Sequence, residues 1–347
     1  MSTYIDYKGL SVLSPTPPGL PAQTVDANFK TIADSLGRLS PCAAILKHLP
    51  SSNGSVECMC SFEGDLYVGT GNATTAQVWK YDGVDWSLSH DFGSPFTTVE
   101  SLAVYNGKLY AGLGEGTGSA SVWQFDGTSW TSNHDFASTF NRVEALIVYG
   151  AKLYAGLGVA ADCADIWEYD GSTWSLSHDF GSGFERVQRL CIYNGDLYIG
   201  MGQGAGHAAV YKFDGTNWTL SNTFASTLYS VRSMAVYGDK LFVGLQGVSG
   251  SGTPQLHCFD GTNWSLIRDF GSAAVRIESL LGVRGRLWIG TGESPGLAKI
   301  YVYDGTTVTL VYDPGPSVAQ VEYLHWHDGR LWFGLGRLTF PWVGEIG

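Results

Sequence analysis

A ten-residue phrase recurs along most of this chain. The stretch YNGKLYAGLG at 105–114 returns as YGAKLYAGLG at 149–158 and as YNGDLYIGMG at 193–202. A fixed period in this range restricts the fold to a solenoid or a propeller. The LxxGxG ending, or a close variant, begins at seven leucines spaced 43, 44, 44, 44, 46 and 44 residues apart: Leu66, Leu109, Leu153, Leu197, Leu241, Leu287 and Leu331.

One period reads as four short strands. The second repeat offers segments at 99–105, 108–114, 121–127 and 128–136, and none shows apolar residues every three or four positions as a helix would. Asn-Gly and Asp-Gly stand between them and favour two-residue hairpin turns, because type I′ geometry needs positive φ. We therefore expect an all-β fold, a seven-bladed β-propeller of four-stranded antiparallel blades.

The two ends of the repeat region complement each other. The seventh repeat ends at 340–347, with enough sequence for a third strand and none for a fourth. Counting back by the period aligns residues 43–50, AAILKHLP, with the fourth strand WSLSHDFG at 86–93. We expect 43–50 to supply the outer strand of the last blade, which would close the ring and cover its open edges. The predicted propeller domain spans 43–347.

The pattern of glycine and aromatic residues in this domain resembles that of kelch repeats. Each repeat has a glycine-ended second strand, an aromatic residue before the third turn and, in most copies, a tryptophan in the fourth strand. GxG stands here where kelch repeats usually have paired glycines. The resemblance implies a kelch-like propeller and leaves the function open, because propellers carry out many unrelated functions.

Composition and missing motifs exclude several classes of function. The net charge of −12 disfavours a nucleic-acid partner and docking on an anionic membrane. No apolar run approaches the roughly 18 residues of a membrane span. Glycine-rich stretches lead into strands, whereas a phosphate-binding loop needs a helix. We therefore expect no cofactor, no metal and a non-enzymatic protein; the alternative is a channel-mouth hydrolase or lyase that uses Glu100 and Glu144.

One polar position recurs near the start of each first strand. The seven side chains would ring one mouth of the central channel. The functional interpretation is a cation or ligand site. The alternative is a solvated ring neutralised by neighbours such as Arg142, Arg186 and Arg276, because carboxylates near one axis repel each other. The ring consists of Glu57, Glu100, Glu144, Gln188, Arg232, Glu278 and Glu322.

The loops between second and third strands differ from repeat to repeat and share that rim, whereas the opposite face carries uniform Asn-Gly and Asp-Gly turns. Divergent loops on one rim are where a binding surface is expected. The candidate loop residues are Asn72, Thr74, Glu115, Thr117, Asp162, Gln203, His207 and Glu293.

Three other patterns are interpreted as structural. Tryptophans recur in the fourth strands, which favours packing between blades over sugar stacking. The His-Asp-Phe phrases that begin at His90, His134 and His178 have no nucleophile beside them. His325 and His327 share a strand face but lack a third metal ligand. The six cysteines form no CxxC pair and are expected to be small buried residues.

Residues 1–42 lie outside the repeat. The stretch 14–21, SPTPPGLP, indicates an extended linker, and the a/d-type apolar spacing after it predicts a helix over about 25–39. This helix either docks on the propeller or associates with copies of itself, as in a trimer, or with a larger partner. Its apolar face consists of Val25, Phe29, Ile32, Leu36 and Leu39.

The segment 7–36 resembles the short N-terminal regions of bacteriophage tail-fibre and related virion proteins, on the phrases GLSVLSPTPPG and NFKTIADSL. The resemblance implies an arm that binds other virion proteins, a displayed distal domain and a place in the phage particle. Our leading hypothesis is a non-enzymatic, tail-fibre-type protein whose propeller binds a host-surface receptor or glycan. The alternatives are a structural decoration or spacer of the virion and, if the resemblance is accidental, a free cytoplasmic lectin or scaffold.

Overall fold

The computed structural model describes most of the repeat region and two short segments before it. Every regular element in these ranges is a β-strand, without any α-helix, so the predicted all-β class is confirmed. The helix predicted over about 25–39 lies outside the described residues. The described residues are 3–7, 10–14, 44–49, 54–71, 74–116, 118–136, 139–158, 164–181, 183–202, 208–248, 252–271, 275–336 and 342–346.

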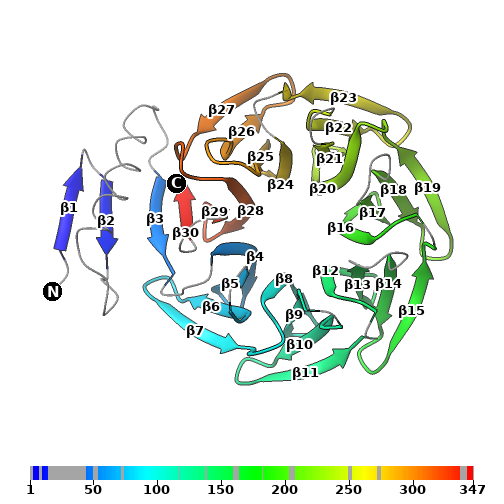
Figure 1. Ribbon diagram of the computed structural model, residues 1–347, viewed down its shortest axis with the longest axis horizontal. Coiled ribbons are helices and arrows are strands. Elements are labelled where there is room, and N and C mark those ends of the chain that lie inside the picture. Colours follow the sequence, from blue (N-terminus) through cyan, green and yellow to red (C-terminus); the bar gives the residue numbers. More distant parts are fainter. Residues whose placement is uncertain are drawn as a thin grey trace.

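The repeats fold into four-stranded antiparallel blades, as predicted. Within a blade each strand pairs with the next one along the chain. Figure 1 shows the first strands nearest the centre and the fourth strands at the periphery. The first three blades consist of β4 (Ser55–Phe62), β5 (Asp65–Gly71), β6 (Gln77–Tyr81) and β7 (Trp86–Asp91); β8 (Thr98–Tyr105), β9 (Lys108–Gly114), β10 (Ser121–Phe125) and β11 (Trp130–Asp135); and β12 (Arg142–Tyr149), β13 (Lys152–Gly158), β14 (Asp165–Tyr169) and β15 (Trp174–Asp179).

The same strand order continues through the second half of the chain. The next three blades consist of β16 (Arg186–Tyr193), β17 (Asp196–Gly202), β18 (Ala209–Phe213) and β19 (Trp218–Thr223); β20 (Leu228–Tyr237), β21 (Lys240–Gly247), β22 (Gln255–Phe259) and β23 (Trp264–Asp269); and β24 (Arg276–Val283), β25 (Arg286–Gly292), β26 (Lys299–Tyr303) and β27 (Val308–Tyr312).

The last strands find their fourth partner near the start of the chain. β28 (Gln320–His327), β29 (Arg330–Gly336) and β30 (Trp342–Ile346) form a meander, and β3 (Ala44–His48) pairs antiparallel with β30. β28 also packs against β4. The first and last parts of the repeat region therefore lie side by side (Figure 1).

The N-terminal segment begins with a β-hairpin, which was not predicted from the sequence. β1 (Thr3–Tyr7) and β2 (Leu10–Ser14) pair antiparallel, with Tyr7 opposite Leu10. The extended linker predicted at 14–21 lies, apart from Ser14, outside the described residues. The first segment, TYIDY, is rich in the β-branched and aromatic residues that favour strands, whereas LSVLS contains one such residue, Val12.

The Asn-Gly turns have the predicted geometry. Tyr105 pairs with Lys108, so two residues connect β8 and β9. Asn106 and Gly107 both have positive φ, 48° and 72°. This is the type I′ turn, whose twist matches that of the flanking strands.

The Asp-Gly turns are longer than predicted. Phe125 pairs with Trp130, so four residues connect β10 and β11. Asp126 Oδ1 accepts hydrogen bonds from the N–H groups of Thr128 and Ser129, both at 2.9 Å. The aspartate closes the loop with its own side chain, which is an Asx turn rather than a two-residue hairpin.

Both glycines of the LxxGxG phrase face the next blade. A Cβ on Gly156 would lie 2.6 Å from Val187 Cγ1 and 3.1 Å from the Val187 carbonyl oxygen. A Cβ on Gly158 would lie 2.6 Å from the Cα of Arg186, with which Gly158 pairs in a single bridge between β13 and β16. Adjacent blades therefore approach too closely for a side chain at either position.

The fourth-strand tryptophans pack between blades. Trp174 lies on Tyr169 with ring centroids 5.0 Å apart and planes 18° apart, and His134 of the preceding blade stacks on Trp174 at 5.8 Å. Trp130 and Phe125 repeat the arrangement at 5.1 Å. The histidines of the His-Asp-Phe phrases thus contribute ring packing, and the tryptophans have the packing role that the sequence favoured.

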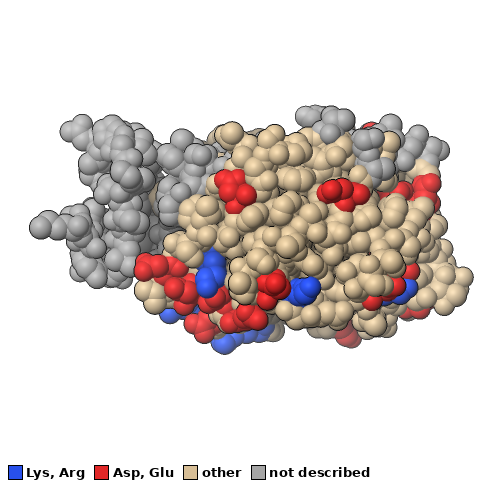
Figure 2. All heavy atoms as spheres, turned by 90° about the horizontal axis from the view of Figure 1, so that it is seen from below, with Lys and Arg blue, Asp and Glu red and all other residues tan. Residues whose placement is uncertain are grey.

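Charged residues gather mainly along one edge of the face shown in Figure 2. Ion pairs join second to third strands, such as Lys80 with Asp65 at 2.8 Å and Lys212 with Asp196 at 2.6 Å. Of the thiols, Cys58 and Cys258 are buried and free. Within the described part of the chain, we find no helix with the length and apolar character needed to cross a membrane.

Candidate ligand-binding site

The seven predicted ring residues share one backbone feature that the sequence did not reveal. Each is the extra residue of a β-bulge near the start of a first strand. For example, Val99 pairs with Leu113 and Ser101 with Gly112, which leaves Glu100 without an opposite residue. Bulges re-aim a side chain away from the regular alternation of a strand. The same shift occurs at Glu57, Glu144, Gln188, Arg232, Glu278 and Glu322.

The bulges direct polar side chains into a common cavity of about 350 Å³. Five of the seven predicted residues line it, whereas Glu144 lines a smaller adjoining cavity of about 60 Å³ together with Arg189. Glu278 bonds to two arginines of the wall. The larger cavity is lined by Glu57, Thr98, Glu100, Glu115, Arg142, Arg186, Gln188, Tyr229, Arg232, Gln246, Arg276, Gln320 and Glu322.

Arginines neutralise much of the carboxylate charge. Arg142 Nη1 lies 3.1 Å from Glu100 Oε1, and Arg186 Nη1 lies 3.1 Å from Glu144 Oε1. Each pair joins one blade to the next. This is the neutralised ring that the sequence offered as the alternative to a ligand site, although it accounts for only part of the cavity wall.

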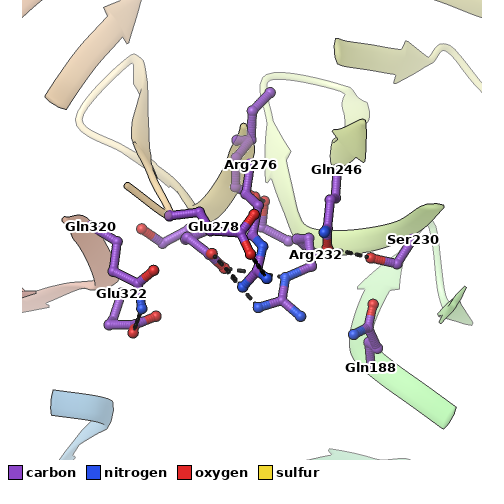
Figure 3. A network of polar contacts seen from close by, with 12 residues as sticks. Gln188, Ser230, Arg232, Gln246, Arg276, Glu278, Gln320 and Glu322 are labelled. Carbon is purple, nitrogen blue, oxygen red and sulfur yellow. Dashed lines mark hydrogen bonds and ion pairs between the residues drawn. The ribbon is translucent and has the colours of Figure 1, made fainter. Parts of the chain in front are cut away.

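Glu278 forms the most enclosed pairing. Its carboxylate accepts from Arg232 of the preceding blade, with Nη2 to Oε2 at 3.0 Å and Nε to Oε2 at 3.2 Å, and from Arg276 Nη1 at 3.3 Å. Figure 3 shows both guanidiniums converging on Glu278. The pKa of Glu278 is lowered although burial acts to raise it, because Arg232 and Arg276 stabilise the charged form more strongly.

Two variable-loop residues reach this network. Glu115 forms an ion pair with Arg142, and Glu293 forms one with Arg276. Both glutamates have positive φ, 101° and 110°, a conformation that non-glycine residues seldom adopt. Thr74 is described and exposed. The other loop candidates, Asn72, Thr117, Asp162, Gln203 and His207, lie outside the described residues.

Amide and hydroxyl groups form the wall around Arg232. The Gln188 amide donates to Val231 O and Ser230 Oγ, both at 3.1 Å, and accepts from Arg232 Nη1 at 3.0 Å. Ser230 Oγ in turn donates to Gln246 Oε1 at 3.3 Å. These uncharged polar groups come from β16, β20 and β21 and lie across the group from Gln320 and Glu322 (Figure 3).

Glu322 lies on the other side of the cavity, beside the Gln320 amide (Figure 3). Burial raises the pKa of Glu322 well above its usual range, and the charges of Glu57 and Glu278 raise it further. Burial also raises the pKa of Glu57. Glu322 accepts a hydrogen bond from Gln320 Nε2, and Glu57 accepts one from Ser55 Oγ. Arg232 and Arg276 act against this rise without outweighing it, whereas the same two arginines lower the pKa of Glu278.

Gln320 is the functional candidate that sequence reasoning missed. It occupies the first position of β28, which corresponds to Arg142, Arg186 and Arg276 in other blades. The three arginines stand at a fixed offset of two residues before the ring position, and this offset is the signal that could have located Gln320. The amide replaces a guanidinium beside Glu322, so this blade lacks its positive charge.

The two histidines of the HWH stretch belong to a separate contact. Ser61 Oγ of β4 lies 2.9 Å from both His325 Nε2 and His327 Nδ1 of β28. Burial and, to a smaller extent, the charge of His327 together lower the pKa of His325 to about 4. No group of three or more His, Cys, Asp or Glu side chains that could hold a metal ion occurs among the described residues.

Comparisons with known proteins identify the fold. No protein-family model matches the chain, and no curated protein matches it. A solved structure described as YCF48 bound to D1 peptide has a TM-score of 0.61 at 12% identity and covers 87% of this chain and 96% of that chain. The solved structure of the RRP9 WD40 repeats has a TM-score of 0.61 at 12% identity and covers 87% of this chain and 97% of that chain. The structure of U3-55K has a TM-score of 0.60 at 12% identity and covers 87% of this chain and 98% of that chain.

At this level of identity the likeness carries the fold alone. It extends over most of this chain and nearly all of each solved structure, and the described blades have the matching four-stranded order. The kelch-like character suggested by the repeat does not appear among these matches, which include WD40 repeats. The chain therefore has a β-propeller fold.

Proposed function

We propose that this chain is a non-enzymatic binding protein of a phage virion, of the tail-fibre type, whose propeller binds a host-surface glycan at the mouth of its central channel. The observation that carries the proposal is the cavity of about 350 Å³ at the bulge residues, which combines charged groups with amide and hydroxyl groups. Such a mixture of fixed donors and acceptors suits a small polyhydroxylated ligand.

The proposed architecture has seven blades and a closed ring. β3 on β30 would complete the last blade, and the contact of β28 with β4 would close the circle. A closed ring keeps first strands at fixed distances, so that bulge residues of different blades stay convergent. The proposed domain limits are 1–42 for the arm and 43–347 for the propeller, with 43–50 supplying the closing strand.

The proposed attachment role of residues 1–42 is supported by their resemblance to virion arms on GLSVLSPTPPG and NFKTIADSL. A helix over 25–39 with an a/d-type apolar face would bind other virion proteins or join three copies. Two heptads are marginal alone, so assembly would need support from neighbouring subunits. The test is the solution mass of the full chain beside a 42–347 truncation: we expect a trimer or larger species that becomes a monomer.

A non-enzymatic role is favoured by the surroundings of the two carboxyls that an acid–base mechanism would use. Their pKa values move apart as in an acid–base pair, because burial raises that of Glu100 to about 7 and nearby guanidiniums, that of Arg186 foremost, lower that of Glu144 although burial acts to raise it; the geometry opposes such a role. Both carboxyls pair with arginines. The cavity that both of them line measures only about 60 Å³, which is too small for a sugar ring between them.

The receptor role is tested by binding of the labelled 42–347 propeller to host cells. Gln246→Trp fills the cavity from its wall and should abolish most of the binding. Gln124→Trp is the matched control, because Gln124 lies in the third strand β10 and does not line the cavity. Unchanged binding by the Gln246 variant would reject the mouth as the receptor site. Normal binding together with less stable particles would favour a structural decoration instead.

A further inference from the structure

The side of the cavity at Glu322 contains a buried hydrogen-bond acceptor, Gln320 Oε1, with no donor among the described residues. Gln320 is only 3% exposed, and its Oε1 finds no hydrogen-bond partner among the described residues. Gln320 lines the cavity, and its Nε2 donates to Glu322. That bond fixes the amide orientation when Glu322 is charged, because the reversed amide would then place two oxygens together. A buried acceptor without a donor costs free energy, so this position calls for a ligand that donates.

The neighbours of Gln320 define the kind of donor. Glu322 contributes a carboxylate, and Glu57 lines the same cavity. Ion pairs of the described residues bring arginines to Glu100, Glu144 and Glu278, and none of them involves Glu322. This side therefore presents acceptor oxygens without an ion-paired guanidinium at Glu322, and a cationic donor would stabilise the charged form of its carboxyls.

We propose that Gln320 and Glu322, with Glu57 beside them, bind the primary ammonium group of an amino sugar whose amine is not acylated. An ammonium has three N–H donors and no acceptor, which suits an amide oxygen and carboxylates. Hydrogen bonds with an ionised partner are also the stronger ones. The inference rests on the proposed function of the mouth as a glycan-binding site and names the sugar class that it takes.

The rest of the cavity suits the body of a sugar. Gln246 and Gln188 line the cavity opposite Gln320 and Glu322 and provide amide groups for ring hydroxyls (Figure 3). Tyr229 also lines the wall and offers an aromatic surface. Guanidiniums on the remaining walls repel an ammonium, so the amine has one favourable end of the cavity. The ligand would therefore bind in a single orientation.

A metal ion fits the same oxygens less well. Calcium prefers six to eight oxygen ligands with several carboxylates among them. The described residues contain no group of three His, Cys, Asp or Glu side chains suited to a metal ion. The volume also exceeds the space of a single ion. Calcium chloride therefore serves as a competing probe in the test.

The test is calorimetric titration of the full chain with glucosamine, N-acetylglucosamine, glucose and calcium chloride. We expect glucosamine to bind, and its acetylated and deaminated counterparts to bind roughly tenfold more weakly or not at all, because each lacks the charged donor. Glu322→Gln and Gln320→Leu should each weaken glucosamine binding by a similar factor. The control is Glu168→Gln, which breaks an ion pair with Lys152 away from the cavity.

Loss of glucosamine binding by Glu322→Gln should not come from unfolding of the variant. The substitution removes a buried carboxyl whose charged form is poorly compensated. The unfolding midpoint of the variant should stay equal to or above that of the wild type while glucosamine binding falls. Equal affinity for glucosamine and glucose overturns the inference, and so does calcium binding that displaces glucosamine and needs Glu322.

The two proposals fail separately. If no sugar binds but Gln246→Trp still abolishes binding to host cells, the mouth is a receptor site and the ammonium inference is wrong. If glucosamine binds through Glu322 but the Gln246 variant still binds host cells normally, the ammonium site stands and the receptor role falls.

Discussion

The indole N–H of Trp174 donates to Asn133 Oδ1 of the preceding blade at 2.7 Å. Equivalent bonds join Trp130 to Ser89 at 3.0 Å and Trp264 to Ser221 at 3.3 Å. Each bond links a fourth strand to the fourth strand before it, at the periphery of the propeller. Blades are thus connected at their outer edges as well as through the core.

Replacing Trp174 by phenylalanine isolates the contribution of this bond. The ring stacking on Tyr169 is largely kept, whereas Asn133 loses a partner, so the free energy of unfolding should fall by about 1–2 kcal/mol. Denaturant unfolding measures the change. Trp86→Phe is the control, since Trp86 Nε1 has no hydrogen-bond partner among the described residues. An equal loss in both variants would assign the effect to ring size alone.

Gly156→Ala should destabilise the protein by about 1–3 kcal/mol, because the new methyl overlaps Val187 of the next blade. Thermal and denaturant unfolding both measure this. In the double variant with Val187→Ala, the two effects should be less than additive, because the nearest atom has been removed. Simple additivity would show that the methyl is accommodated elsewhere.

Arg232→Met leaves the buried Glu278 with Arg276 as its remaining described partner. Loss of one partner of a buried pair costs about 3–5 kcal/mol, so the unfolding midpoint should fall steeply. Adding Glu278→Leu should recover most of the loss, because no uncompensated carboxylate remains in that place. A double variant no more stable than Arg232→Met would place the main role of Arg232 in its bond to Gln188.

The Ser61–His325–His327 contact predicts acid sensitivity. The folded pKa of His325, about 4, lies below the usual 6.5, so the unfolded chain binds more protons between these values. The contribution to stability is complete above pH 6.5 and is lost as the pH falls towards 4. His325→Gln should flatten this part of the stability profile, as measured by denaturant unfolding across the pH range. An unchanged slope would transfer the acid sensitivity to other groups.

Removal of residues 1–49 should destabilise the fold far more than removal of residues 1–41. The longer truncation deletes β3 and the buried Leu49, which exposes the edge of β30. We expect the 42–347 chain to unfold at a midpoint similar to that of the full chain, and the 50–347 chain to aggregate or unfold at a lower temperature. Equal midpoints for both truncations would contradict the proposed closure of the ring.

The fold was predictable because each local signal agreed with the next. The period, the glycine-ended second strand and the Asn106-Gly107 turn all favoured short antiparallel strands, and the structure has them. The Asp-Gly turns were predicted too short, because the dipeptide does not reveal that Asp126 accepts from two backbone N–H groups beyond the glycine. Side-chain capping of this kind depends on the loop length, which alternation in the strands does not fix.

The candidate site was predictable in position and only partly in composition. The period located the seven ring residues, but the two-residue periodicity of strands gave no sign that each one is a bulge residue. Gln320 was missed because its counterparts in other blades are arginines and hydroxyl residues of different size. Whether Glu278 is neutralised and Glu322 is not depends on which blades carry an arginine beside them, and this follows from packing across blades.

The close contact of Gly156 with Val187 explains why the chain repeats its phrase so faithfully. Each period carries a glycine with room for the β-branched residue of the following period, and a β-branched residue that fits against the glycine of the preceding period; this residue is valine in most copies and Ile277 in one. A duplicated segment of one full period would bring a matching contact surface at each end, whereas a change in one copy alone would disturb its neighbour. Growth of such a protein by whole repeats is therefore far less disruptive than drift within one.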